Sequence, residues 1–226
     1  MVRADDPPLT TTKGICMSSA ATAPTGQTLG RPTLADRFIP RSAVNNALLI
    51  VGGAAVVGVF AQIQIPLWPV PITGQTLAVM LVGASLGAWR GASALALYLV
   101  AGLAGVPLFA GFASGIASVA KPDFGFIIGF VFAAALIGWL SERNWDKHPL
   151  LSLAGFFGAS IVPFLFGLPY LGFALGSLGL PNDLNSVLVA GFYPFMLGGV
   201  IKWAIAAAIL PVAWKAVRAV DARSQS

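Results

Sequence analysis

The sequence predicts an all-α integral membrane protein with six transmembrane helices. Of its 226 residues, 57% are hydrophobic and only 9% are charged, whereas soluble domains carry roughly a quarter charged residues. In water, a chain this apolar would expose a mostly hydrophobic surface. The 26 glycines and 16 prolines also fit transmembrane helices, in which both residues are commoner than in soluble helices.

Six apolar stretches follow one another along the chain, each near the length of about 20 residues that crosses a bilayer. In order they are Ala43 to Ala61, Ile72 to Trp89, Gly91 to Val106, Phe124 to Ser141, Leu150 to Tyr170 and Val189 to Trp214. The second and third meet at Arg90, so we expect a very tight turn there. In the fifth, Pro163 and Pro169 are expected to bend the outer end of the helix.

The two ends of the chain differ from this apolar region. Residues 1–36 are rich in Pro, Thr, Ala, Gly and Ser, which predicts a disordered tail. Asp5, Asp6 and several prolines stand where a signal peptide needs an apolar core, so the tail does not read as one. Residues 37–220 are expected to form one six-helix transmembrane domain, and residues 221–226 a short C-terminal tail.

Three irregular segments separate the apolar stretches. They run from Gln62 to Gln75, with three prolines in six residues, from Pro107 to Pro122, and from Leu171 to Ser186. Backbone that lacks hydrogen bonds is costly in lipid, so these segments must lie at the membrane surface or line a cavity. They are either simple connectors or, because connectors are usually short, a ligand-capture site with a lid.

The distribution of basic residues predicts the orientation. With a cytoplasmic N-terminus, only Lys121 falls on the outer side. The inner side carries Arg37, Arg41, Arg90, Arg143, Lys147, Lys215, Arg218 and Arg223. The positive-inside rule therefore places both termini in the cytoplasm and all three irregular segments on the outer face, around an outward-facing pocket. The same rule explains the net charge of +5 without a nucleic-acid partner.

Lys202 is the single charge within the sixth apolar stretch. If that helix enters from outside near Phe192, ten residues at about 1.5 Å each place Lys202 about 15 Å deep, near the bilayer centre. A lysine there costs about 3 kcal/mol on translocon scales, so we expect it to meet an acceptor or an anion inside the bundle. The alternative is a structural lysine that bonds backbone carbonyls or snorkels to the surface.

Further polar candidates for ligand binding come from the second and third stretches. Thr73 and Gln75 stand where the Pro-rich segment meets the second stretch. The Gln75 amide offers a donor and an acceptor to a polar ligand, whereas a threonine here also suits a helix cap. Tyr98 lies in the middle of the third stretch, where its phenol needs a partner from a ligand or from another helix.

Aromatic and acidic residues gather toward the outer face. Phe109, Phe126 and Tyr193 fit either the mouth of an aromatic-lined pocket or an aromatic belt at the membrane interface. Asp123 and Asp183 are the acids of the outer half. Both belong to the irregular segments or their edges, and we expect Asp123 to pair at the surface with the neighbouring lysine.

Small residues four apart mark one face of the first stretch. Ala43 and Ala47 form one such pair, and Ala54 and Gly58 form another. Small residues at this spacing let helices approach closely, so this face is a candidate partner-binding surface.

Several functional classes are excluded by what the sequence lacks. A single cysteine and a single histidine rule out a disulfide framework and a Cys- or His-based metal site. No P-loop, nucleophile elbow or zinc-protease motif occurs, so we expect no enzymatic activity, no bound metal or cofactor, and no ATP binding by this chain.

Taken together, these residues resemble the BioY biotin transporter family. Residues 62–109 carry the family's motifs at Pro66 to Leu77, Leu81 to Gly91 and Tyr98 to Phe109. The segments KPDFGFIIGF, at 121–130, and FYPFMLGGVIK, at 192–202, resemble two further elements of the family. The resemblance extends over about residues 43–215.

Two departures from the family pattern fall near the expected site. The family's Asp three residues before the lysine is Gly199 here, and its Gly and Thr around Pro122 are Lys121 and Asp123. That Asp and Lys are implicated in holding biotin in the family, and only Lys202 carries over.

The resemblance implies the substrate-capture (S) component of an energy-coupling-factor transporter, with residues 37–220 as the substrate-binding domain. Lys202, Gln75, Thr73, Tyr98, Phe109, Phe126, Tyr193 and Gly199 are then the candidate substrate-binding residues. It also implies the plasma membrane of a prokaryote, and as partners a transmembrane T component and two ATPases that use ATP, or a homo-oligomer if the protein acts alone. The competing hypotheses are an S component for another vitamin or small metabolite, and a non-transporting membrane scaffold.

Overall fold

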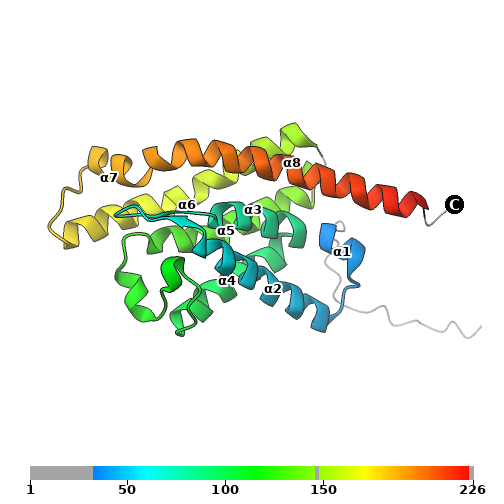
Figure 1. The fold of residues 1–226 in the computed structure, drawn as a ribbon, viewed down its shortest axis with the longest axis horizontal. Coiled ribbons are helices and arrows are strands. Elements are labelled where there is room, and N and C mark those ends of the chain that lie inside the picture. Colours follow the sequence, from blue (N-terminus) through cyan, green and yellow to red (C-terminus); the bar gives the residue numbers. More distant parts are fainter. Residues whose placement is uncertain (1–32, 146–147, 224–226) are drawn as a thin grey trace, which may run out of the picture.

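The computed structural model describes residues 33–145 and 148–223, which are almost entirely helical (Figure 1). Its longer helices are α2 (Ala43–Gln62), α3 (Gln75–Leu86), α4 (Ala88–Leu103), α5 (Phe124–Ser141), α6 (Pro149–Ser177) and α8 (Tyr193–Arg223). Its short elements are α1 (Leu34–Phe38), β1 (Gln64–Ile65), β2 (Ile72–Thr73), η1 (Ala110–Phe112), η2 (Ile116–Ala120) and α7 (Leu184–Gly191).

Four helical segments of the described chain are long and apolar enough to cross a membrane. They are Ala43–Gln62, Phe124–Ser141, Leu150–Ser177 and Leu184–Ile209. Helices α3 and α4 are apolar but have only 12 and 16 residues, which is about 18 and 24 Å against a hydrocarbon core of about 30 Å. The described chain is thus a multi-pass membrane protein with four long candidate spans and two shorter apolar helices, rather than six spans of full length.

The second predicted span begins too early because its first residues form a strand. Ile72 and Thr73 pair with β1 in a two-stranded antiparallel sheet, in the register Gln64 to Thr73. We call residues 63–74 the hairpin. The turn between α3 and α4 lies at Gly87, three residues before Arg90, and its φ of +87° is a conformation that favours glycine.

Helix α6 is longer than the sequence predicted. It continues through Pro163 and Pro169 to Ser177, so the first part of the segment expected to be irregular, Leu171 to Ser186, is helical. The physical reason is burial: Leu171 is fully buried and Leu175 nearly so, because α6 packs against the bundle there. The connection from α6 to α7 is therefore short.

The sixth predicted span, Val189 to Trp214, is two helices. Helix α7 ends at Gly191 and α8 begins at Tyr193, with Phe192 in a non-helical conformation between them. Asp183 caps α7 by accepting a hydrogen bond from the Ser186 backbone N–H at 3.2 Å. This break places the start of α8, and hence Lys202, relative to the rest of the bundle.

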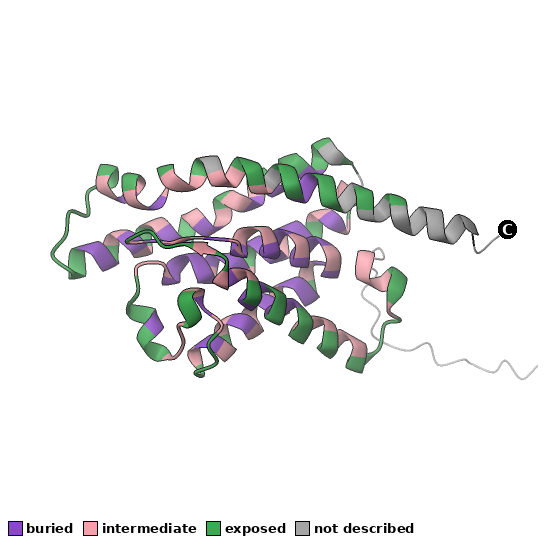
Figure 2. Cartoon of the chain, viewed as in Figure 1, coloured by how far each residue is buried: buried purple, intermediate pink, exposed green. Residues whose placement is uncertain are grey.

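Helix α5 is the centre of the bundle. It packs mainly against α6, α3 and α4, and Figure 2 shows buried residues concentrated in this inner layer. Glycines make the close approach possible: a Cβ on Gly129 would lie 2.5 Å from the Cα of Pro163 in α6. Small residues thus bring α5 and α6 together, as they do in other membrane bundles.

The two ends of the bundle differ in character. The hairpin, the segment between α4 and α5, and the α6–α7 connection lie at one end, while α1 and the C-terminal end of α8 lie at the other (Figure 1). The sequence predicted that the irregular segments share one face, and their common position agrees with that expectation.

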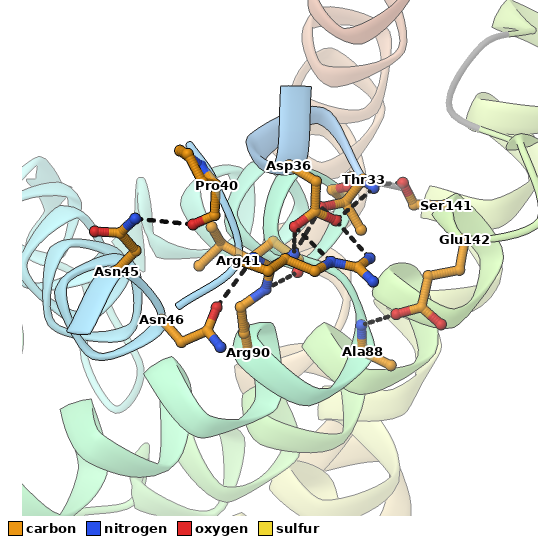
Figure 3. Close-up of polar contacts among 12 residues, drawn as sticks. Thr33, Asp36, Pro40, Arg41, Asn45, Asn46, Ala88, Arg90, Ser141 and Glu142 are labelled. Atoms are coloured by element: carbon orange, nitrogen blue, oxygen red, sulfur yellow. Dashed lines mark hydrogen bonds and ion pairs between the residues drawn. The ribbon is translucent and has the colours of Figure 1, made fainter. Parts of the chain in front are cut away.

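A polar cluster of Thr33, Asp36, Arg41 and Arg90 joins α1 to the start of α4 (Figure 3). Asp36 forms ion pairs of 2.8 Å with Arg41 and with Arg90, and Arg90 also donates to Thr33 at 2.8 Å. Thr33 and Asp36 belong to the segment 1–36 that was expected to be disordered, so its end is ordered by this cluster; residues 1–32 lie outside the described part.

Candidate ligand-binding site

A pocket of about 760 Å³ of atom-free space, part of it open to solvent, lies toward the end of the bundle that carries the hairpin. The hairpin contributes Val70, Pro71 and Thr73, α3 contributes Gln75 and Thr76, and Asp123 stands before α5. The remaining walls come from α5 (Phe126, Ile127, Phe130), α6 (Ser160, Pro163, Phe164) and α8 (Phe195, Met196, Gly199, Lys202).

A chain of hydrogen bonds runs along one side of this pocket. Lys202 Nζ donates to the backbone carbonyl of Thr73 at 2.5 Å. The Thr73 hydroxyl donates to Gln75 Oε1 at 2.9 Å, and Gln75 Nε2 donates to the Tyr98 hydroxyl at 2.6 Å. These bonds link α8, the hairpin, α3 and α4, so they hold the polar side of the pocket in one arrangement.

Aromatic rings form the apolar side. Phe126 of α5 meets Phe164 of α6 edge-on, with centroids 5.7 Å apart, and stacks on Phe195 of α8 at 6.2 Å. Phe164 also meets Phe192 at 5.2 Å, in the break between α7 and α8. Rings in such mutual contact have restricted positions, so they present a stable apolar surface to a ligand.

Lys202 has features both of a ligand-binding lysine and of a structural lysine, the two roles considered from the sequence. It is half-buried and lines the pocket, and it also bonds a backbone carbonyl, as a structural lysine would. An ammonium has three N–H donors. Within the described residues, Lys202 forms one hydrogen bond to the protein, so its ammonium has N–H donors left for a ligand.

The structure brings five of the eight candidate substrate-binding residues to the pocket wall. These are Lys202, Gln75, Thr73, Phe126 and Gly199. Tyr98 and Phe109 instead lie behind the wall, where both are buried and their rings meet edge-on at 5.5 Å. Tyr193 is 56% exposed and does not line the pocket.

The two small-residue pairs of the candidate partner-binding face on α2 differ in burial. Ala54 and Gly58 are buried within this chain, and a Cβ on Gly58 would lie 2.8 Å from the side chain of Leu108. Their small size thus serves packing inside the bundle, and their role in binding a partner stays a prediction. Ala43 and Ala47 are exposed at the other end of α2.

Asp123 is a pocket residue that the sequence analysis assigned to the surface. It lines the pocket and precedes α5, while Lys121 is exposed. Burial raises the pKa of Asp123, and its own backbone N–H and the charge of Lys121 only partly oppose this effect. The sequence does contain one indication of this position: Asp123 directly precedes an apolar helix, so its carboxylate lies at the end of the bundle. No group of three or more His, Cys, Asp or Glu that could hold a metal occurs among the described residues.

Comparison with known proteins supports one family. The model of the BioY family matches residues 32–219. The chain is 37% identical over 157 residues to a biotin transporter BioY of Rhizobium etli, covering 66% of this chain and 81% of the relative. It is 32% identical to the biotin transporter BioY of Thermotoga maritima, covering 76% of this chain and 93% of the relative.

A solved structure agrees with these relatives. The crystal structure of the S-component for biotin from an ECF-type ABC transporter aligns with a TM-score of 0.53 and 27% sequence identity, over 76% of this chain and 92% of that chain. The match to the family model covers the helices that build the pocket. The chain therefore belongs to the BioY family.

Proposed function

We propose that this protein captures biotin and serves its uptake across the plasma membrane of a prokaryote, as the substrate-binding component of an energy-coupling-factor transporter. One observation carries the proposal: a chain of the BioY family has a pocket that is lined by a half-buried lysine and by several phenylalanines. Relatives in the family are named biotin transporters. Of the residues expected from the sequence, Lys202, Gln75, Thr73 and Phe126 line this pocket.

The chemistry of biotin matches the two sides of the pocket. Biotin has a carboxylate at one end and a fused bicyclic ring, which includes a urea, at the other. An ammonium such as that of Lys202 forms strong, charge-assisted hydrogen bonds with a carboxylate. The rings of Phe126, Phe164 and Phe195 offer apolar contact to the sulfur-containing part of the bicycle.

In the membrane, the proposal gives the chain six membrane-crossing helices, with both termini in the cytoplasm and the pocket open to the outside. Helices α3 and α4 are short, so the hairpin and the loop before α5 would complete the outer leaflet around them. Transport would be driven by a transmembrane T component with two ATPases, or by a homo-oligomer of this chain. The chain itself would bind no cofactor and catalyse no reaction.

Direct binding of biotin to the detergent-purified protein tests the proposal. Saturable binding with a dissociation constant well below micromolar is expected. Lys202→Met keeps the aliphatic stem and removes the charge, and it should weaken binding roughly ten- to hundredfold, as the loss of a charge-assisted bond does. Lys215→Met is the matched control, since Lys215 is exposed on the same helix.

A ligand change separates the role of the lysine from a general loss of structure. If Lys202 holds the carboxylate, biotin methyl ester binds the wild-type protein more weakly than biotin, whereas Lys202→Met binds both alike. Absence of saturable biotin binding by the wild-type protein would overturn the proposal and leave the scaffold hypothesis in its place.

A different vitamin is the second candidate, and Gly199 favours it. This position lines the pocket next to Lys202 in space and lacks any side chain, so the pocket has room and no carboxylate there. A thermal-shift screen of vitamins against the purified protein separates the two candidates: the true ligand raises the unfolding midpoint most at equal concentration.

A further inference from the structure

Asp123 is the one carboxylate among the residues that line the pocket. It immediately precedes α5, yet its side chain does not cap that helix. An aspartate in this position usually accepts a hydrogen bond from the first turn of the helix. Its carboxylate oxygens are therefore not occupied by the backbone N–H groups of the first turn of α5.

The surroundings of Asp123 provide little compensation for its burial. Ile127 and Phe126, one turn further along α5, and the hairpin residue Val70 line the same pocket. Asp123 takes part in neither of the ion pairs that Asp36 forms with Arg41 and Arg90. Its electrostatic interactions are with its own backbone N–H, with the charge of exposed Lys121 and with the phenol of Tyr98, which carries no positive charge.

A partly buried carboxylate with so few partners costs free energy unless a donor reaches it. An ionised carboxylate only accepts hydrogen bonds. The missing group must therefore be an N–H or O–H donor, and the open side of Asp123 is the pocket.

We propose that Asp123 contacts the ligand and determines its specificity, by accepting a hydrogen bond from an N–H donor of a urea or amide group. The inference rests on the proposed function, in which biotin supplies both groups that the pocket requires: an acceptor for Lys202 and ureido N–H donors for Asp123. Lys202 lies on α8 and Asp123 before α5. The two charges thus recognise a ligand that carries acceptor and donor groups together.

The test combines variants of Asp123 with ligands that lack one donor. Asp123→Ala removes the acceptor, and Asp123→Asn keeps its shape but not its charge. Asp183→Asn is the matched control, since Asp183 is an exposed aspartate that caps α7 outside the pocket. Each purified protein is titrated calorimetrically with biotin and with biotin methylated on either ureido nitrogen.

We expect Asp123→Ala to bind biotin roughly ten- to hundredfold more weakly than wild type, Asp123→Asn to lie between them, and Asp183→Asn to bind normally. One methylated isomer should bind the wild-type protein more weakly by a similar factor, and Asp123→Ala should no longer distinguish it from biotin. Loss of that discrimination is a result that a purely structural role of Asp123 would not produce.

Three outcomes would overturn the inference. One is normal biotin binding by both Asp123 variants, which would make Asp123 a surface partner of Lys121. Another is weaker binding of every ligand with unchanged discrimination. A third, which needs no variant and so holds even if the variants fail to fold, is wild-type protein that binds both methylated isomers as well as biotin. In all three the wild type still binds biotin, so the proposed function stands; if it does not bind biotin, both fail.

Discussion

At the scale of single residues, the polar side chains of the site depend on one another. Gln75 is buried, and its side-chain amide forms hydrogen bonds with two neighbours, Thr73 and Tyr98. A buried polar group that loses its partner costs more than the bond itself was worth, since water does not replace the partner. Tyr98, which lies behind the pocket wall, thus helps to fix the position of Gln75, which lines the pocket.

Tyr98→Phe tests this dependence. The substitution keeps the ring, which is fully buried, but deprives Gln75 Nε2 of its acceptor. We expect a loss of roughly 1–3 kcal/mol in the free energy of unfolding and a several-fold weaker biotin affinity. The unfolding midpoint in detergent and a binding titration measure the two effects. Tyr193→Phe, at an exposed tyrosine, should change neither; equal effects of the two substitutions would contradict the argument.

Asp36 allows a prediction about pH. Burial alone would raise its pKa, but hydrogen bonds from Arg41, from Thr33 and from Arg90 outweigh burial and lower the pKa below its ordinary value of 3.8. A lowered pKa in the folded state contributes stability that is present above pH 3.8 and is lost as the pH falls toward the folded value.

Asp36→Asn should therefore lower the free energy of unfolding by about 3 kcal/mol near neutral pH, because it leaves the buried guanidinium of Arg90 without its carboxylate. The difference from wild type should shrink as the pH falls from 3.8 toward the lower pKa of the folded protein, where the wild-type carboxyl also becomes neutral. Unfolding midpoints of both proteins across this range provide the measurement, and a difference that does not vary with pH would refute the prediction.

At the scale of elements, the position of α5 depends on glycine at its contact with α6. This contact matters to the pocket, because α5 contributes Phe126 and α6 contributes Phe164 to the aromatic wall. Any substitution that separates the two helices should therefore alter binding as well as stability.

Gly129→Ala makes this prediction specific. The new Cβ would lie 2.5 Å from the Cα of Pro163, which is backbone and cannot rotate away. Overpacking of this kind costs about 2 kcal/mol, and we expect weaker biotin binding along with a lower unfolding midpoint. Gly158→Ala, on α6, is the control, since a Cβ there meets nothing within 4 Å. Equal tolerance of the two substitutions would show that the helices separate without cost.

Sequence reasoning located the helices better than their ends. The spans beginning at Ala43 and at Phe124 agree closely with α2 and α5, because long apolar runs with polar or proline-rich flanks leave little choice. The start of α3 was wrong because Ile72 is equally apolar in a strand and in a helix. The break at Phe192 has no compositional signal, since apolar residues continue through it.

The candidate site was partly predictable for a similar reason. Lys202 stands out because a charge in an apolar run must have a cause. Asp123 does not stand out, since pairing with its neighbour Lys121 is a simpler explanation, and only the fold shows that Asp123 lines the pocket. The distinction between Gln75, at the pocket wall, and Tyr98, behind it, depends on how α3 packs against α4, which a linear pattern does not contain.

At the scale of the whole molecule, the two unlike ends predict the orientation in the membrane. In a background of Cys16→Ser, the variant Trp68→Cys places a thiol on the exposed hairpin. Arg143→Cys places one at an exposed position next to Glu142, which accepts a hydrogen bond from Ala88 at the start of α4, near α1. A membrane-impermeant maleimide should label Trp68→Cys in intact cells, and Arg143→Cys only after permeabilisation. Labelling with the reverse pattern would invert the proposed topology.

The bond between Lys202 and the hairpin also bears on how mutations are tolerated. Its acceptor is the main-chain carbonyl of Thr73, which every amino acid possesses. Replacement of the Thr73 side chain therefore leaves the acceptor in place, whereas nearly any replacement of Lys202 removes the donor. The hydrogen bond between the hairpin and α8 therefore tolerates substitution of Thr73 but not of Lys202. Most replacements at position 73 should keep the bond to Lys202 but lose the hydrogen bond from the Thr73 hydroxyl to Gln75, whereas most replacements at position 202 should lose the bond to the hairpin.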